Sequence, residues 1–114
     1  MESQLIKDYQ ITASSSFNGD FATYGPQRAR LNLASWPPGY RANPTMLQSS
    51  WIKVNLVTEK VITGLATQGY GDTAVKEWAT SYSVMYRSKL GDLLQITSMQ
   101  GGSKVGYSLK SISV

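Results

Sequence analysis

Three turn-rich segments carry side chains that could form a ligand-binding surface. Residues 17–27 and 34–50 combine Gly, Pro and Asn with aromatic rings, and residues 69–77 hold two Gly beside polar and charged side chains. Gly, Pro and Asn favour turns, so these segments are predicted to be loops that display their side chains. The candidate ligand-binding residues are Phe21, Tyr24, Tyr40, Arg41, Tyr70, Asp72 and Lys76.

The chemistry of these loop residues fits either a lipid or a sugar ligand. An exposed aromatic ring on a rigid turn can enter a lipid interface or stack on a sugar, because it is apolar and loses little rotamer entropy. Arg41 and Lys76 could each contribute roughly 1 kcal/mol of attraction to anionic headgroups. Asp20 and Asp72 weaken a purely electrostatic membrane site and could instead accept hydrogen bonds from sugar hydroxyls. The alternatives are that the rings fold back to cap the domain and that the charges are simply solvated.

Catalytic chemistry has little support in this sequence. The chain has no Cys and no His, which excludes thiol nucleophiles, Ser-His-Asp chemistry, thiolate or imidazole zinc sites and internal disulfides. Asp20, Asp72 and Asp92 lie on expected loops without a partner base, so no carboxylate pair for acid–base catalysis is evident. We therefore predict a protein that is not an enzyme and that requires no cofactor.

Length and charge further limit the classes of protein to which this chain could belong. The 114 residues suffice for one domain with a single core, so residues 1–114 are predicted to form one domain. Eleven Lys and Arg against seven Asp and Glu give a net charge of +4 that is spread along the chain. This charge implies a mild attraction to anionic surfaces, whereas nucleic-acid binding would need clustered cations and a recognisable reading element. No apolar stretch approaches the roughly 20 residues of a transmembrane helix.

Strands are expected to position the three loops, because no segment keeps an apolar helical period over several turns. Residues 51–57 alternate, with Ile52, Val54 and Leu56 on one face, and are predicted to pair as a hairpin with residues 61–68 across a connector at 58–60. Residues 78–87 alternate over the longest stretch and are expected to form the best strand. Further extended segments are predicted within residues 5–16, 28–33, 93–99 and 105–114, with a turn at 100–103. The aromatic residues assigned to the core are Trp36, Trp51, Trp78, Tyr82 and Tyr86.

Several short motifs follow one another along the chain. They are Gln10-Ile11 with Ala13-Ser14-Ser15-Ser16, then Ala29-Arg30-Leu31-Asn32, the run from Trp51 to Leu56, Ala66-Thr67-Gln68-Gly69, and the run from Trp78 to Tyr86. In this order they resemble the discoidin domain family, the coagulation factor V and VIII type C domains. The resemblance covers about residues 1–92, with Lys53 and Asn55 as departures, and residues 93–114 form a divergent tail.

The resemblance implies an antiparallel, all-β, discoidin-like jelly-roll barrel or sandwich, or most of one. It also implies a non-enzymatic extracellular recognition module for cell adhesion, which binds anionic phospholipid or carbohydrate through the three loops at one barrel end. The alternative is a protein-interaction or structural piece of a larger extracellular protein with no small ligand. Some relatives hold calcium largely through loop carbonyls, which leave little trace in the side chains.

Two further expectations rest on the same resemblance. The family's paired cysteines would lie outside this segment, so the absence of Cys does not point to the cytosol. The chain is instead expected to be extracellular, as part of a longer secreted or membrane-anchored protein. Arg30, within the Ala-Arg-Leu-Asn motif, is expected to make a structural ion pair or backbone hydrogen bonds rather than to contact ligand.

Overall fold

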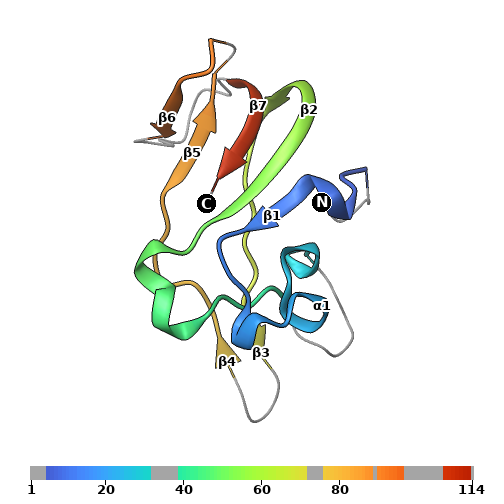
Figure 1. Ribbon diagram of the computed structural model, residues 1–114. Coiled ribbons are helices and arrows are strands. Elements are labelled where there is room, and N and C mark those ends of the chain that lie inside the picture. The colour runs from blue at the N-terminus through green and yellow to red at the C-terminus, as the bar shows by residue number, and fades with distance from the viewer. Residues whose placement is uncertain (1–4, 32–38, 72–75, 89, 97–106, 114) are drawn as a thin grey trace.

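Antiparallel strands and short helical turns make up most of the part of the chain that the structure describes (Figure 1). The computed structural model describes residues 5–31, 39–71, 76–88, 90–96 and 107–113. The strands are β1 (Ile11–Ala13), β2 (Ile52–Ile62), β3 (Tyr70–Gly71), β4 (Lys76–Glu77), β5 (Val84–Arg87), β6 (Leu93–Ile96) and β7 (Tyr107–Ser113). The helical turns are η1 (Asp8–Gln10), η2 (Phe17–Gly19), α1 (Phe21–Tyr24), η3 (Pro26–Arg28) and η4 (Pro44–Ser49).

One sheet holds five of these strands in the order β1-β2-β7-β5-β6, and β3 pairs with β4 separately. All of these pairs are antiparallel, which confirms the predicted all-β class. Over the described residues the sheet remains open rather than closing into a barrel. The strands predicted within 93–99 and 105–114 are confirmed as β6 and β7, whereas the turn predicted at 100–103 lies outside the described residues.

An apolar row crosses the whole five-stranded sheet. Ile11, Val54, Ile112, Tyr86 and Leu94 are successive Cα partners from β1 to β6. Because neighbouring residues of a strand point to opposite faces, partners in one row belong to the same face of the sheet. The alternation predicted for residues 51–57 is confirmed by the burial of β2, which rises at every second residue through its first half.

The described core lies around Leu56, a buried residue of β2. The partly buried side chains packed against it are Ile6, Val54, Ile62, Val84 and Tyr86. Arg30 fixes the N-terminal segment over this core, since its Nη2 donates to the Ile6 carbonyl oxygen at 2.8 Å and to the Asp8 carboxylate. The Arg30 side chain is buried, so its expected structural role is confirmed.

The predicted hairpin between residues 51–57 and 61–68 is wrong, because one continuous strand, β2, runs through the expected connector. β7 pairs with both halves of β2, from Lys53 to Asn55 and again from Lys60 to Ile62. Between these two stretches the register shifts, and Val57 adopts a positive φ of 65°. The polar residues 58–60 therefore stay in the strand, and Lys60 pairs with Leu109 of β7, which is distant in the sequence.

The long strand predicted at 78–87 is mostly wrong, since only Val84–Arg87 pairs, with β6 and β7. Trp78 is 66% exposed, and Tyr82 and Trp51 are also exposed, so their assignment to the core is wrong. Tyr86 lies in the paired part and packs against Leu56, as predicted. Trp36 lies outside the described residues. Alternation alone selected residues 78–83, but the sheet provides them with no partner among the described strands.

The segment around Arg28 is helical rather than extended. Pro26 opens η3 at its first position, where its fixed φ and missing N–H suit a helix start, and Arg28 ends it. The extended segment predicted at 28–33 is therefore wrong at its beginning, and residues 32 and 33 are not described. Within the described part of 34–50 the structure has η4 and irregular chain, as the prolines predicted.

Candidate ligand-binding loops

Three connections gather at one end of the sheet, which we call the loop end. They are residues 17–28 with α1, residues 40–50 with η4, and the β3–β4 hairpin (Figure 1). The entry to the first connection lies beside the exit from the second, because Ser14 N donates to the Trp51 carbonyl oxygen and Trp51 N donates to Ser14 Oγ, each at 3.0 Å. The sheet thereby fixes where the first two connections start and end.

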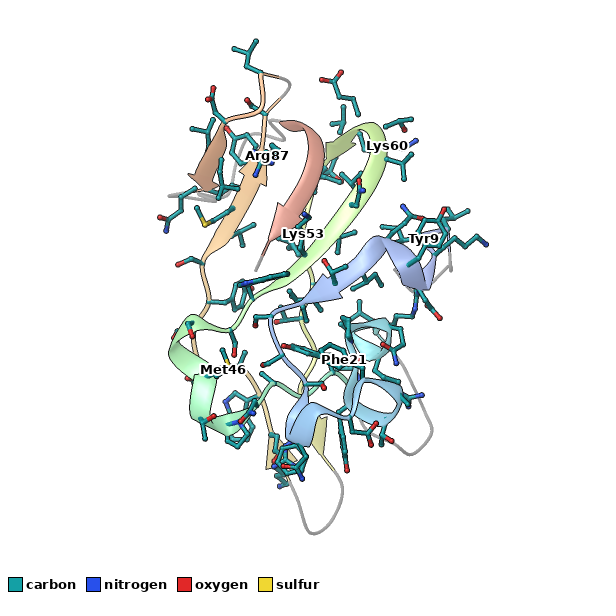
Figure 2. The ribbon with its side chains drawn as sticks, viewed as in Figure 1. Tyr9, Phe21, Met46, Lys53, Lys60 and Arg87 are labelled. Atoms are coloured by element: carbon teal, nitrogen blue, oxygen red, sulfur yellow. The ribbon has the colours of Figure 1, made fainter. Side chains whose placement is uncertain are left out.

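Phe21 stands on a helical turn that is capped at both ends. Asn18 and Gly19 take positive φ values of 52° and 73°, which reverse the chain before α1, as the Asn-Gly pair predicted. Asp20 caps the helix by accepting a hydrogen bond from Thr23 N at 2.9 Å. Gln27 Nε2 donates to the Phe21 carbonyl oxygen at 2.7 Å at the other end. The Phe21 side chain remains 49% exposed on this support (Figure 2).

Hydrogen bonding also favours the ionised form of the Asp20 carboxyl that caps the helix. The backbone N–H of Thr23 holds the pKa of the Asp20 carboxyl below its ordinary value of 3.8, with the Thr23 side chain adding to the effect. Asp20 therefore serves the local fold as a capping anion at a helix start, where negative charge is favourable. The hydrogen bond leaves the negative charge of Asp20 in place, so Asp20 still weakens the electrostatic attraction of an anionic ligand to this loop.

Gly25 lets the chain pass from α1 directly into η3. A Cβ atom at this position would lie 2.1 Å from the Phe21 carbonyl oxygen and 2.4 Å from Gln27 Oε1, so no larger residue fits without a shift of the backbone. Because Gly25 has no side chain, the Phe21 carbonyl oxygen can accept a hydrogen bond from Gln27 Nε2. The first loop is thus held in one shape by its own contacts.

Arg41 lies at the centre of a cluster that joins all three connections, the Arg41 cluster, made of Phe17, Tyr24, Arg41 and Glu77. The guanidinium carbon lies 4.1 Å from the centroid of the Phe17 ring, a cation–π contact. The rings of Phe17 and Tyr24 meet edge to face, with centroids 5.3 Å apart and an interplanar angle of 76°. Arg41 Nη2 also lies 3.0 Å from Glu77 Oε1 on β4.

Backbone hydrogen bonds hold Arg41 against the first loop. Phe17 N donates to the Arg41 carbonyl oxygen at 2.9 Å, and Arg41 N donates to the Tyr24 carbonyl oxygen at 3.2 Å. The neighbouring Tyr40 hydroxyl donates to the Ser15 carbonyl oxygen at 3.1 Å, and partial burial raises the pKa of Tyr40 above its ordinary value of 10.0. Asn43 N donates to Ser15 Oγ at 3.1 Å. The second connection is therefore tied to the end of the first strand.

The structure separates the predicted site residues into groups. Tyr24 and Arg41 meet in the Arg41 cluster, and Tyr40 anchors the loop beside them. Phe21 and Lys76 are exposed. The backbone of Tyr70 pairs with Glu77 in the β3–β4 hairpin, but its side chain and all of Asp72 lie outside what the structure describes. For Tyr70 and Asp72 a ligand contact stays a prediction.

Sequence reasoning missed Phe17, Glu77 and Met46. Phe17 belongs to the same aromatic-rich segment as Phe21 and Tyr24, which was a usable signal. Glu77 gave no such signal, because its partner Arg41 lies 36 positions earlier in the sequence. Met46 is a half-exposed apolar residue on η4, and Figure 2 places it at the loop end with Phe21, whereas Lys60 and Arg87 lie toward the opposite end.

Two other features were sought in the described part of the chain. It contains no group of three or more His, Cys, Asp or Glu side chains arranged to hold a metal ion. It also contains no helix long and apolar enough to cross a membrane. A shallow pocket does lie beside η1, lined by Ile6, Lys7, Asp8, Tyr9 and Arg30, and Tyr9 lies away from the loop end (Figure 2).

Connections that gather at one end of an antiparallel sheet are where β-sandwich domains commonly bind their ligands. The F5/8 type C domain matches residues 10–110 of this sequence. The chain therefore belongs to the F5/8 type C, or discoidin, domain family.

Individual relatives agree with this family. The chain is 38% identical over 93 residues to mouse EGF-like repeat and discoidin I-like domain-containing protein 3, a match that covers 75% of the chain and 18% of the relative. It is 39% identical over 87 residues to mouse coagulation factor VIII, with 73% and 4% covered. It is 32% identical over 93 residues to retinoschisin of Takifugu rubripes, with 76% and 31% covered.

The chain thus spans less than a third of the length of each of these relatives. Discoidin domains are typically non-enzymatic binding modules of extracellular proteins.

Proposed function

We propose that this chain attaches to anionic phospholipid surfaces through its loop end, as an extracellular adhesion module. The observation that carries the proposal is Phe21, a half-exposed ring on a capped helical turn. The loop end also presents Met46 as a second exposed apolar side chain, with Arg41 and the exposed Lys76 as cations. Membership in the F5/8 type C domain family supports the coarser role of an extracellular binding module.

The energetics favour a shallow, reversible attachment. Burying the exposed half of a Phe ring in the lipid interface would contribute about 1 kcal/mol, because complete burial of such a side chain is worth about 1.5–3 kcal/mol. Each cation near an anionic leaflet adds roughly 1 kcal/mol, and this part is screened by salt within about a Debye length. Neither contribution alone gives firm attachment, so the module depends on both.

Co-sedimentation with phosphatidylserine-containing vesicles tests the proposal. We expect Phe21→Ala to weaken binding about fivefold, which corresponds to the loss of about 1 kcal/mol of ring burial. We also expect binding to the wild type to fall as salt rises and to be weaker on phosphatidylcholine alone. Leu93→Ala is the matched control, since Leu93 is likewise 49% exposed but lies on β6, away from the loop end.

Two outcomes would contradict lipid attachment. One is equal loss of vesicle binding in Phe21→Ala and Leu93→Ala, which would indicate nonspecific adsorption of apolar surface. The other is binding to a glycan array without any binding to vesicles, especially if Tyr70→Ala or Asp72→Ala abolishes it. That result would favour a carbohydrate ligand at the same loop end.

A further inference from the structure

The guanidinium of Arg41 is oriented by contacts that do not depend on Glu77. Its backbone is fixed by hydrogen bonds to Tyr24 and Phe17, and the Phe17 ring lies against the flat guanidinium. The Phe17 ring occupies one face of the guanidinium. The N–H groups lie in the guanidinium plane, so they can still donate hydrogen bonds to other partners. One of these groups is the Nη2 that meets the Glu77 carboxylate at 3.0 Å.

The Arg41–Glu77 pair contributes little to stability. The side chains are 41% and 43% exposed, and exposed ion pairs are worth about 0–1 kcal/mol. The Arg30–Asp8 pair is different, because Arg30 is 8% exposed and also holds the Ile6 carbonyl oxygen. The Arg41–Glu77 ion pair, unlike Arg30–Asp8, can therefore separate without loosening the core.

Glu77 resembles a ligand in its chemistry. A carboxylate on a guanidinium makes the same charge-assisted hydrogen bonds as a phosphate, and the planar fork of Arg suits both groups. An anion that replaced Glu77 would find Arg41 already in position, so it would lose little entropy in ordering the site. The released carboxylate would return to water, which is easy for a side chain that is already almost half exposed.

We propose that Arg41 is an anion-binding residue whose site is occupied by Glu77 in the free chain, and that a phosphate group of the ligand displaces Glu77. This inference rests on the proposed function and specifies which residue of the loop end meets the headgroup. Glu77 then sets affinity by competition, so removing its charge strengthens binding. Lys76, its neighbour on β4, belongs to the opposite face of the strand and does not share this role.

The test compares Glu77→Gln with Glu59→Gln on phosphatidylserine-containing vesicles. Both substitutions raise the net charge by one, and Glu59 is an exposed residue of β2. We expect Glu77→Gln to bind about two- to fivefold more tightly than Glu59→Gln, the range that corresponds to the worth of an exposed ion pair. In an Arg41→Gln background the Glu77→Gln substitution should no longer increase binding beyond that control. Urea unfolding of each variant checks that the fold is retained.

A second arm, titration with inorganic phosphate, separates a free anion from a lipid headgroup. An increase with Glu77→Gln in either arm supports the displacement. Vesicle binding that requires Phe21, with no response to Glu77→Gln in either arm, would overturn it and leave the proposed function standing. Glu77-dependent phosphate binding without vesicle binding would support the displacement and contradict the proposed membrane function. No binding by any variant in either arm would overturn both.

Discussion

At the scale of single residues, the loop end depends on short-range hydrogen bonds that hold side chains in place. Asp20 fixes the start of α1, Gln27 holds its end, and Tyr40 joins the second connection to Ser15. These bonds serve to present the Phe21 ring and the Arg41 guanidinium on short turns that would otherwise sample many conformations. The residues that would touch ligand are therefore fewer than the residues that position them.

The Asp20 cap predicts a pH dependence of stability. Because the pKa of Asp20 is lowered in the folded state, its contribution is fully present above its ordinary value of 3.8. The contribution is lost as the pH falls through the lower folded-state value. We expect wild-type stability to fall below about pH 3.8 relative to Asp20→Asn, whose amide oxygen still caps the helix but does not titrate.

Urea unfolding between pH 2.5 and 6 measures this difference. Asp92→Asn is the control, because it removes the same charge at an exposed position just before β6. If wild type and Asp20→Asn keep a constant difference across the whole range, the carboxylate of Asp20 has no special role in the cap. The same holds if Asp92→Asn changes the pH profile as much as Asp20→Asn does.

At the scale of elements, β2 organises the molecule, because it pairs with β1 on one side and β7 on the other. Its irregular middle allows β7 to pair twice, and Val57 lies there with a φ of 65°. For a β-branched residue the left-handed region is strained by about 1–2 kcal/mol. A stretch that looks like a continuous strand thus contains one unfavourable backbone position.

This strain predicts opposite effects for two similar substitutions in β2. Val57→Gly should stabilise the chain by up to about 1 kcal/mol, because Gly adopts positive φ without strain. Val61→Gly should destabilise it by a similar amount, since Val61 pairs regularly with Ser108 in an extended conformation. Both side chains are 64% exposed, so the loss of burial is matched. Urea midpoints compare the two, and a Val57→Gly variant that is less stable than Val61→Gly would refute the strained bulge.

How much of the fold could be predicted differs from strand to strand. The first half of β2 alternates because one face is buried, so the sequence pattern was sufficient there. The continuation of β2 through 58–60 depends on β7, which lies about 50 residues later and leaves no local signal. For β5, alternation was present from Trp78 onward, but strand pairing begins only at Val84.

The candidate site was partly predictable for a similar reason. Turn-forming residues located the three connections, in which Phe21 and Tyr24 lie on the helical turn α1 and Tyr40 and Arg41 lie in irregular chain. The sequence could not show that the Tyr24 ring packs on Phe17 or that Arg41 pairs with Glu77, because these contacts form only when separate connections meet. The position of each loop can be predicted from nearby turn-forming residues. The contacts between loops depend on how the sheet places them next to one another.

At the scale of the whole molecule, the chain divides into a sheet and a loop end (Figure 1). The antiparallel sheet brings together Phe17, Arg41 and Glu77 from three connections, and the Arg41 cluster then joins them by stacking and charge. Exposed apolar side chains also occur on the sheet, such as Leu93 and Leu94 on β6. We propose that the loop end, and not this sheet surface, meets the membrane.

Hydrogen–deuterium exchange on phosphatidylserine-containing vesicles compares the two surfaces directly. A surface that contacts the membrane or becomes ordered there exchanges its amides more slowly. We expect slower exchange in residues 17–27 and 40–46 on vesicles than in solution, and no change in β5 and β6. Protection confined to residues 84–87 and 93–96, with the loop amides unchanged, would show that the sheet surface and not the loop end contacts the membrane.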